Sequence, residues 1–288
     1  RPQLQGNGSR VLSLFHAATG GSESSEAGSL PSMKIATWNV NSVKARLAHL
    51  VRWLKEAAPD VVMLQELKCQ TADFPRLEIE AAGYQAEVVG QKSYNGVAIL
   101  AKHRIEKPIH ALPGGDGDDH ARYVEATVKG LRVASIYLPN GNPIGTEKFR
   151  YKLAFFDRLR LHALELLATE APAILAGDWN VCPTDEDVWD PKAMAKDALC
   201  QPESRAAFRT ILYQGWTDAI RAVHPHTREY TYWDYFQNRY ERDHGLRIDH
   251  LLLSPRAADR LTDAGVDRTP RGWEKASDHT PERCTLSD

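Results

Sequence analysis

The chain has 288 residues, of which 42% are hydrophobic and 26% charged, and its 36 lysines and arginines stand against 38 acidic residues, a net charge of -2. This composition predicts a soluble globular protein, and no apolar run approaches the ~18 residues that a membrane span needs. The charge balance excludes a uniformly basic nucleic-acid-binding surface but not a local basic patch. The length allows two domains or one large α/β domain.

The first 32 residues differ from the rest of the chain. Residues 1–32 contain seven serines and five glycines, and we interpret them as a disordered N-terminal extension. From residue 33 onward, strand-like and helix-like patterns alternate with no intervening linker. We therefore expect residues 33–288 to form a single α/β domain with two packed sheets and outer helices.

Short runs of β-branched and apolar residues predict the strands. These runs lie at 34–40, 61–65, 96–101, 123–128, 131–138, 173–176 and 248–253, and a last strand is expected to start at His279. Apolar residues at helical spacing predict helices over 43–57, with Ser42 as N-cap, and over the stripe 149–163 that follows Thr146. A third helix is expected near 203–214, and the Gly- and Asp-rich stretch 110–120 is expected to be a loop.

The four cysteines contain no CxxC pair, which argues against a zinc site or a disulfide framework in a chain of this size. We expect reduced thiols and a cytoplasmic location. The cysteines are Cys69, Cys182, Cys200 and Cys284.

Polar residues suited to a metal or a phosphate stand at the ends of several apolar strands. They are Asn39, Asn41, Glu66, Tyr137, Asn140, Asp178, Asn180, Asp249, Asp278 and His279. A carboxylate at the end of a buried strand is costly unless it is paired or binds a cation. One such residue is usually a turn former, but this many predict side chains that converge on one crevice.

The donor atoms favour a hard cation, because all of them are oxygens except those of one histidine. This set suits Mg²⁺ or Mn²⁺ better than zinc. Such a metal permits attack of water on a phosphodiester. Asp178 would orient or deprotonate the water, and His279, held by Asp249, would donate to a phosphate oxygen. Tyr137 would act beside the phosphate as a hydrogen-bond donor or as a phenolate. A serine hydrolase is disfavoured, since the chain has no GxSxG segment.

At these residues the sequence resembles the exonuclease III family of DNA-repair nucleases, also called the AP endonucleases. The resemblance runs from Met33 nearly to the C-terminus. The matching segments are 37–41, 64–68, 94–98, 137–141, 177–180, 246–249 and 277–279. Each segment alone is a weak signal, but in this order and spacing they are specific.

The resemblance implies a four-layer α/β sandwich of two mixed sheets flanked by helices, of the DNase I type. It also implies a Mg²⁺-dependent enzyme that cuts the phosphodiester 5′ of abasic sites in duplex DNA and often trims 3′ ends. We expect Mn²⁺ to be an alternative metal and the enzyme to be a monomer. The implied metal site consists of ligands or their near neighbours, namely Asn39, Glu66, Asp178, Asn180, Asp278 and His279. The implied catalytic set is Tyr137, Asp178 (general acid or base), Asn180 (stabilising the nucleophile or transition state), Asp249 and His279.

The resemblance further implies a small apolar pocket for a flipped-out abasic sugar, made by Tyr232, Leu246 and Ile248, which a base-bearing nucleotide would be too large to enter. The expected DNA contacts are Asn41, Lys68, Arg122, Asn140, Tyr232, Trp233, Leu246 and Ile248. For Trp233, plain core packing is as good an interpretation. Other basic residues near the matching segments are Lys44, Arg46, Lys92 and Arg247, and a solvated surface position is at least as good an interpretation for each.

Two features depart from the family pattern. The segment after His279 begins Thr280-Pro281-Glu282 where apolar residues are usual, which puts the packing of the last strand in doubt. The acidic loop 116–119 would repel DNA, so we expect it to point away from the groove.

Two alternatives remain open from the sequence. One is a phosphodiesterase acting on lipid or inositol phosphates with the same metal site. The other is a catalytically inactive DNA-binding module, which would lack at least one of Glu66, Asp178, Asn180, Asp249 and His279, and none is missing.

Overall fold

The computed structural model describes residues 32–288, and within this range the strands form two mixed six-stranded sheets. The first sheet contains β1 (Ser32–Asn39), β2 (Val61–Gln65), β3 (Gln85–Val89), β4 (Val97–Ala101), β11 (Leu261–Val266) and β12 (Glu282–Ser287), in the order β11-β12-β1-β2-β4-β3. The second contains β5 (Ile105–Ile109), β6 (Tyr123–Val128), β7 (Leu131–Tyr137), β8 (Ala173–Asp178), β9 (Thr217–Asp218) and β10 (Asp249–Leu253), in the order β5-β6-β7-β8-β10-β9.

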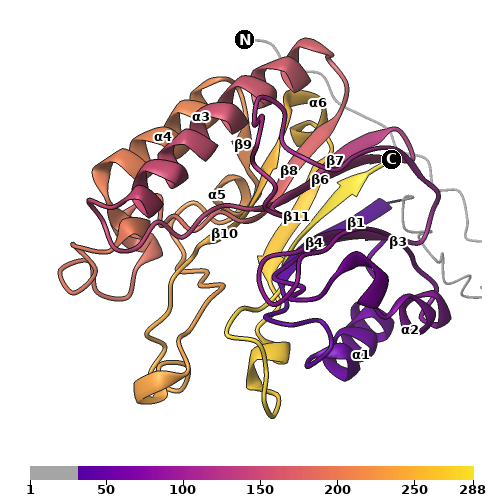
Figure 1. The fold of residues 1–288 in the computed structure, drawn as a ribbon, viewed down its shortest axis with the longest axis horizontal. Helices are drawn as coiled ribbons and strands as arrows, with labels where there is room; N and C mark the ends of the chain where they lie inside the picture. The colour runs from indigo at the N-terminus through magenta and orange to yellow at the C-terminus, as the bar shows by residue number, and fades with distance from the viewer. Residues whose placement is uncertain (1–31) are drawn as a thin grey trace, which may run out of the picture. The chain divides into compact units, whose positions relative to one another are not determined.

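Helices cover the outer faces of both sheets, so that residues 32–288 form four layers (Figure 1). The helices are α1 (Leu47–Ala57), α2 (Arg76–Ala81), α3 (Glu147–Ala168), α4 (Pro202–Tyr213), α5 (Ala219–Val223) and α6 (Pro255–Ala258), and the 3-10 turns are η1 (Thr71–Asp73), η2 (Asp185–Asp187), η3 (Ala198–Cys200), η4 (Phe236–Asn238) and η5 (Thr269–Gly272). Helix α1 packs on the first sheet, and α3 and α4 pack on the second. This confirms the predicted four-layer sandwich.

The core between the sheets is built from apolar side chains of both. Ile35 and Met63 from the first sheet lie in one buried cluster with Val133, Ile174 and Leu251 from the second. Strands β2 and β8 are buried along their whole length. A strand covered on both faces appears as a continuous apolar run, which is why the sequence pattern located these two strands.

Strand pairing brings the polar strand ends together. Strands β1 and β2 run parallel, as do β7 and β8, so their carboxyl ends lie side by side and place Asn39 opposite Gln65 and Tyr137 opposite Asp178. Strand β10 runs antiparallel to β8 and starts where β8 ends, which sets Asp249 opposite Asp178. Side chains from five separate segments therefore lie close together where these strands end.

The first helix begins later than predicted. Helix α1 starts at Leu47 with Arg46 at its N-cap position, and residues 43–46 form a preceding turn in which Ala45 N donates to Ser42 Oγ at 3.3 Å. The reason lies in the neighbouring loop, because Ser42 N donates to the carbonyl of Glu66 at 2.8 Å. The backbone at Ser42 is thus held by the end of β2. The other two predicted helices, α3 and α4, are confirmed.

The last strand also begins later than predicted. Strand β12 starts at Glu282, three residues after His279, and pairs with both β1 and β11. The polar start of the strand is buried: Glu282 is fully enclosed, and its Oε1 accepts from Leu251 N at 3.1 Å. The predicted loop at 110–120 contains no helix or strand, and its Asp118 pairs with Arg158 of α3 at 2.5 Å.

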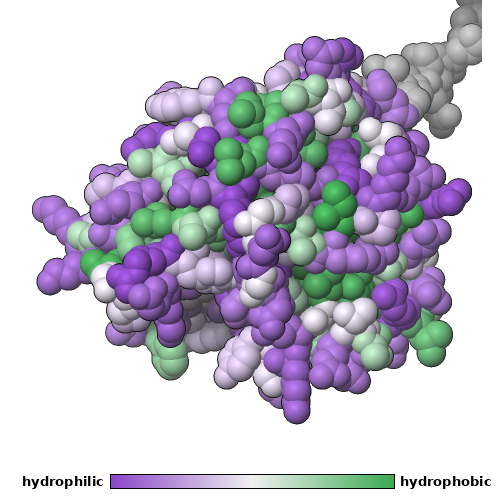
Figure 2. Space-filling view, turned by 45° about the horizontal axis from the view of Figure 1, so that its top comes forward, coloured by the Kyte–Doolittle hydropathy of each residue, from purple (hydrophilic) through white to green (hydrophobic). Residues whose placement is uncertain are grey.

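The predicted extension at 1–32 falls almost wholly outside the described residues, and Ser32 already opens β1. The four cysteines are free and buried. Within residues 32–288, no helix is both long and apolar enough to cross a membrane. On the face drawn in Figure 2, hydrophilic side chains predominate and the hydrophobic ones form small separate patches.

Candidate active site at the strand ends

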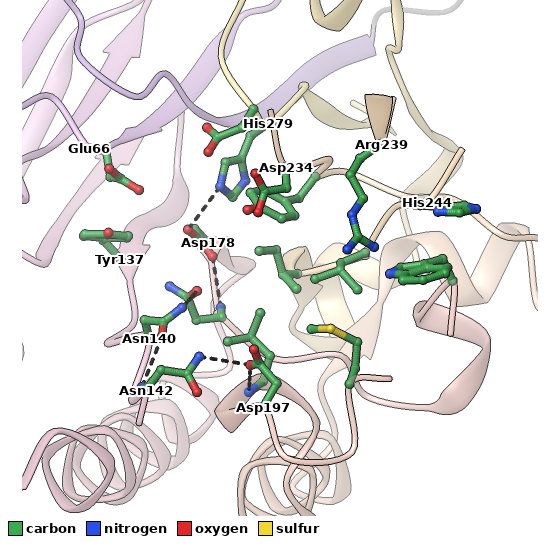
Figure 3. Close-up of a pocket in the computed structure, with 18 residues that line it drawn as sticks. Glu66, Tyr137, Asn140, Asn142, Asp178, Asp197, Asp234, Arg239, His244 and His279 are labelled. Carbon is green, nitrogen blue, oxygen red and sulfur yellow. Dashed lines mark hydrogen bonds and ion pairs between the residues drawn. The ribbon is translucent and has the colours of Figure 1, made fainter. Parts of the chain in front are cut away.

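The polar strand ends surround a pocket of about 410 Å³. The pocket is lined by Glu66, Tyr137, Asn140, Asn142, Asp178, Asn180, Trp189, Met194, Asp197, Leu199, Tyr232, Asp234, Arg239, His244, Leu246, Ile248, Asp278 and His279 (Figure 3). Residues predicted for metal binding, catalysis and sugar binding therefore share one cavity. They come from segments more than 200 residues apart in the chain.

Three of the predicted metal-binding residues form a compact group. Glu66 follows β2, Asp178 ends β8 and His279 precedes β12, and one potential ligand atom from each lies within 4.8 Å of the others. Two carboxylates and one imidazole at this separation can hold a divalent cation, and the predominance of oxygen donors fits a hard one.

Asn39 joins the two carboxylates of this group. Its side-chain Nδ2 donates to Glu66 Oε1 at 2.8 Å and to Asp178 Oδ2 at 2.9 Å, while its Oδ1 accepts from Asn41 N at 3.0 Å. Because Asn39 is buried and its amide is fully engaged, it holds both acids in fixed positions.

A second chain of polar contacts lies beside this group. Lys68 Nζ lies 3.1 Å from Glu66 Oε2 and donates to Asn41 Oδ1 at 2.6 Å. Asn41 Nδ2 in turn donates to Asp278 Oδ1 at 3.0 Å. Lys68, Asn41 and Asp278 are therefore close to Glu66 and keep part of their surface open to solvent.

His279 and Asp249 form the predicted imidazole–carboxylate pair. His279 Nδ1 lies 2.8 Å from Asp249 Oδ2, and its Nε2 faces Asp178 Oδ2 at 3.7 Å. Burial lowers the pKa of His279, but the carboxylates of Asp249 and Asp178 outweigh burial and raise this pKa above its usual value. The ring is thus poised to carry a proton beside Asp178.

The pKa of the Asp178 carboxyl group is higher than that of an ordinary aspartate. Burial, reinforced by the negative charges of Asp249 and Glu66, raises its pKa against the lowering effect of His279. A carboxyl group whose pKa is moved toward neutrality can both accept and return a proton, which is the property that a general base requires.

Tyr137 is a phenol at neutral pH. Burial is the main cause that raises its pKa well above the usual value, and the nearby charges of Glu66 and Asp178 add to it. Of the two predicted forms, the neutral hydrogen-bond donor is therefore favoured over the phenolate. Arg122 lies over the Tyr137 ring at 4.8 Å and donates to the Tyr137 carbonyl at 3.1 Å.

Asn180 is fixed by the end of β7 and the loop that follows it. Its Nδ2 donates to the carbonyl of Leu138 at 2.8 Å, and its Oδ1 accepts from Asn140 Nδ2 at 3.2 Å. Its backbone N donates to Asp178 Oδ1 at 3.0 Å. Hydrogen bonds therefore hold Asn180, Asn140 and Asp178 together.

Four residues at or beside the site have a left-handed backbone conformation. Asn41, Glu66, Lys68 and Asn180 have φ values of 44°, 51°, 54° and 46°, in the left-handed region that residues other than glycine rarely adopt. Each such residue costs about 1–3 kcal/mol and persists only where the surroundings enforce it, which is typical of functional sites.

The apolar side of the pocket contains the three predicted sugar-binding residues. Leu246 and Ile248 are buried, and the partly buried Tyr232 pairs with Leu246 through its backbone. The Tyr232 ring lies edge-on to His279 at 4.9 Å between ring centroids. The apolar wall thus adjoins the imidazole directly.

One of the expected DNA contacts, Trp233, and one of the other basic residues, Arg247, lie in the interior. Trp233 is fully buried and its indole N–H donates to Asp243 at 3.1 Å, so it packs beneath the loop and does not face DNA. Arg247 is 1% exposed and is held by Asp187 at 2.6 Å and Asp218 at 2.9 Å. Its charge is used inside the protein, so the surface-cation interpretation of Arg247 is wrong.

Several of the lining residues were not expected from the sequence. They are Asn142, Trp189, Met194, Asp197, Leu199, Asp234, Arg239 and His244. Except for Leu199, which lies in η3, they stand on loops without a periodic pattern. Asp234 and Arg239 lie in or just after residues 230–236, where five of the seven residues are aromatic, and this cluster was the one available signal.

Comparison with known proteins assigns the family. Residues 36–279 match the Endonuclease/Exonuclease/phosphatase family. The chain is 31% identical over 261 residues to Exodeoxyribonuclease III of Haemophilus influenzae, a match that covers 86% of this chain and 98% of that protein.

Two solved structures are similar along nearly their whole length. An AP endonuclease from Archaeoglobus fulgidus has 35% identity and a TM-score of 0.86, covering 89% of this chain and all of that one. The 3′ phosphatase NExo from Neisseria, solved with a product DNA hairpin, has 37% identity and a TM-score of 0.86, covering 88% of this chain and 99% of that one.

These relatives decide between the open alternatives. Their names describe enzymes acting on DNA, which favours the nuclease over a lipid or inositol phosphodiesterase. An inactive module would lack at least one of five residues, and all five are present: Glu66, Asp178, Asn180 and His279 line one pocket, with Asp249 against His279. The chain belongs to the endonuclease/exonuclease/phosphatase family and is a DNA-repair nuclease of the exonuclease III and AP endonuclease type.

Proposed function

We propose that the protein hydrolyses the phosphodiester 5′ of abasic sites in duplex DNA with Mg²⁺ as its metal, and that it also removes residues from 3′ ends. Mn²⁺ supports the same reaction, and the enzyme acts as a cytoplasmic monomer. One observation carries the proposal: the group of Glu66, Asp178 and His279 opens onto the apolar wall of Tyr232, Leu246 and Ile248 within a single pocket.

The apolar wall explains how an abasic residue is bound. A flipped-out sugar without a base exposes mainly C–H surface, which Leu246, Ile248 and the Tyr232 ring can cover. With the sugar in this position, its 5′ phosphate falls next to the neighbouring imidazole of His279. Partly exposed Lys68 and Arg122 near the site are placed to contact the DNA backbone.

Mg²⁺ would be held by Glu66 and Asp178, with Asp278 and His279 nearby. When bound, it would neutralise charge on the phosphate and lower the pKa of water. Asp178 accepts the proton of the attacking water. Protonated His279, oriented by Asp249, and the phenol of Tyr137 donate hydrogen bonds to the phosphate oxygens. The P–O3′ bond breaks, leaving a 3′ hydroxyl on one side and the 5′ phosphate on the abasic residue.

The test is cleavage of a duplex oligonucleotide with one internal tetrahydrofuran residue, an abasic analogue. We expect Mg²⁺-dependent nicking on the 5′ side of the analogue and none in EDTA. Asp178→Asn and His279→Ala should each reduce the rate by ~10²-fold or more, about 2.7 kcal/mol of activation free energy.

The matched control is Asp119→Asn, which removes an exposed carboxylate from the acidic loop and should leave the rate unchanged. Wild-type rates for both Asp178→Asn and His279→Ala would refute the assigned roles. Nicking that persists in EDTA would refute the metal requirement.

A further inference from the structure

The pocket continues past the sugar-binding wall. In Figure 3, Glu66 and Tyr137 lie on one side of the pocket and Arg239 and His244 on the other, with Asp178 and His279 between them. The volume of about 410 Å³ lies in the range of about 300–1,000 Å³ that holds drug-sized ligands. A deoxyribose with its 5′ phosphate is smaller than such a ligand, so the cavity has room that an abasic residue leaves unused.

This remaining space has a defined lining, which we call the outer arm: Trp189, Met194, Arg239 and His244. The rings of Trp189 and His244 stack at 4.1 Å with an angle of 9° between their planes. Trp189 and Met194 also pack against the buried cluster that contains Leu246. The aromatic wall of the arm is therefore braced by the same core as the sugar-binding wall.

Arg239 supplies a polar group to the outer arm. Its guanidinium lies 4.6 Å from the centre of the Trp189 ring. Within residues 32–288 it forms no ion pair, and its one side-chain hydrogen bond goes to Gln237 Oε1 at 3.1 Å. Donor N–H groups of Arg239 thus remain available to a ligand in the pocket.

A nucleobase matches this lining. Its faces are apolar and stack on aromatic rings or guanidinium planes, and its edges carry acceptors for N–H donors. An abasic residue and a 3′-terminal nucleotide are both cut at their own 5′ phosphate. With that phosphate and the sugar in the same places, the base of a terminal nucleotide extends beyond the sugar-binding wall.

We propose that the outer arm is the binding site for the base of a 3′-terminal nucleotide, so that one pocket serves both abasic and base-bearing residues. This rests on the proposed function, because it places the sugar and phosphate as described there. Water adds to phosphorus and the P–O3′ bond breaks. The products are a nucleoside 5′-monophosphate and a shortened strand with a 3′ hydroxyl.

The test compares two duplexes with the same recessed 3′ end, one ending in dC and the other in tetrahydrofuran. The same bond is cut in both, and only the base differs. Met194→Trp fills the arm, and we expect the ratio of dC removal to tetrahydrofuran removal to fall at least tenfold. Arg239→Gln leaves the space but removes the guanidinium, and should lower the ratio about threefold or more.

Tyr213→Trp adds the same side chain at an exposed position on α4 and should keep the wild-type ratio. An unchanged ratio in both Met194→Trp and Arg239→Gln would overturn the proposal, even if their overall rates fall. The internal tetrahydrofuran duplex is cut in a separate assay. Failure there refutes the proposed endonuclease activity, whereas the ratio at the 3′ end judges the outer arm independently.

Discussion

His250 shows how one buried side chain links stability to pH. The residue follows Asp249, is fully buried, and its Nε2 lies 2.9 Å from the carbonyl of Val181. Burial and the charge of Arg247 lower its pKa to about 4. The ring is therefore neutral in the folded protein, with the Nε2 proton donated to Val181.

We predict that this histidine weakens the fold in mild acid. His250 takes up a proton near pH 6.5 in the unfolded chain, whereas in the folded protein it stays neutral down to about pH 4. The contribution of the neutral ring to the free energy of unfolding is therefore complete above pH 6.5 and is lost as the pH falls. The loss should reach about 2 kcal/mol by pH 5, at 1.36 kcal/mol per pH unit. His250→Gln keeps a donor without titrating.

Urea unfolding at pH 5, 6 and 7 measures the effect. The wild type should lose more unfolding free energy than His250→Gln between pH 7 and pH 5. Equal losses in the two proteins would show that His250 does not titrate in this range.

The active-site residues were predictable one by one because they stand at the ends of apolar strands. Glu66 follows a run of five buried residues, and Asp178 closes another. Their contacts were not predictable. That Asn39 bridges Glu66 and Asp178 through its amide N–H groups depends on how β1, β2 and β8 are placed in space.

At the scale of elements, α3 positions the site as well as covering a sheet. Lys152 on this helix is fully buried, and its Nζ donates to the carbonyl of Asn140 at 3.0 Å and to that of Asn180. These two carbonyls belong to the loops after β7 and β8. One side chain therefore ties together the two loops that carry Asn140 and Asn180.

We predict that Lys152→Met, which keeps the length of the side chain but has no donor, loosens both loops. Two buried carbonyls would lose a partner at about 1–3 kcal/mol each, so the free energy of unfolding should fall by a few kcal/mol. The value of kcat on the internal tetrahydrofuran duplex should fall more than KM rises, because the loops carry Asn140 and Asn180.

Urea unfolding and steady-state kinetics on the same preparations check this, with Lys152→Arg as the variant that retains donors. If Lys152→Met lost stability but kept wild-type kcat, the lysine would support the fold alone.

Elements differed in how well the sequence located them. The run 61–65 was located correctly because β2 is buried on both faces, whereas β3 and β5 escaped notice because their partly exposed residues mix charges with apolar groups. Helix α2 has only six residues, too few for a helical period to show. The start of α1 was misplaced because contacts with Glu66, distant in sequence, override the local helical pattern at residues 43–46.

At the scale of the whole molecule, the two sheets meet at the metal-binding group. Glu66 comes from the first sheet and Asp178 from the second. A cation held between them therefore links the two halves of the sandwich.

We predict that Mg²⁺ raises the melting temperature. A ligand that binds only the folded state increases the free energy of unfolding by about 1.4 kcal/mol for each tenfold rise of its concentration above the dissociation constant. Thermal unfolding with increasing MgCl₂, against KCl of equal ionic strength, measures the effect. Glu66→Gln should flatten the response. A melting temperature that rises equally with both salts would show that no specific cation site joins the sheets.

The sequence by itself determined the fold class, the strands buried on both faces and the types of residue at the site, since burial pattern and strand-end chemistry are local properties. Only the tertiary structure decided which side chains meet. It removed Trp233 and Arg247 from the DNA-facing surface and brought Trp189, Met194, Arg239 and His244 to the pocket. The reason is that loop residues acquire their neighbours from the packing of distant segments, and no spacing along the chain records that packing.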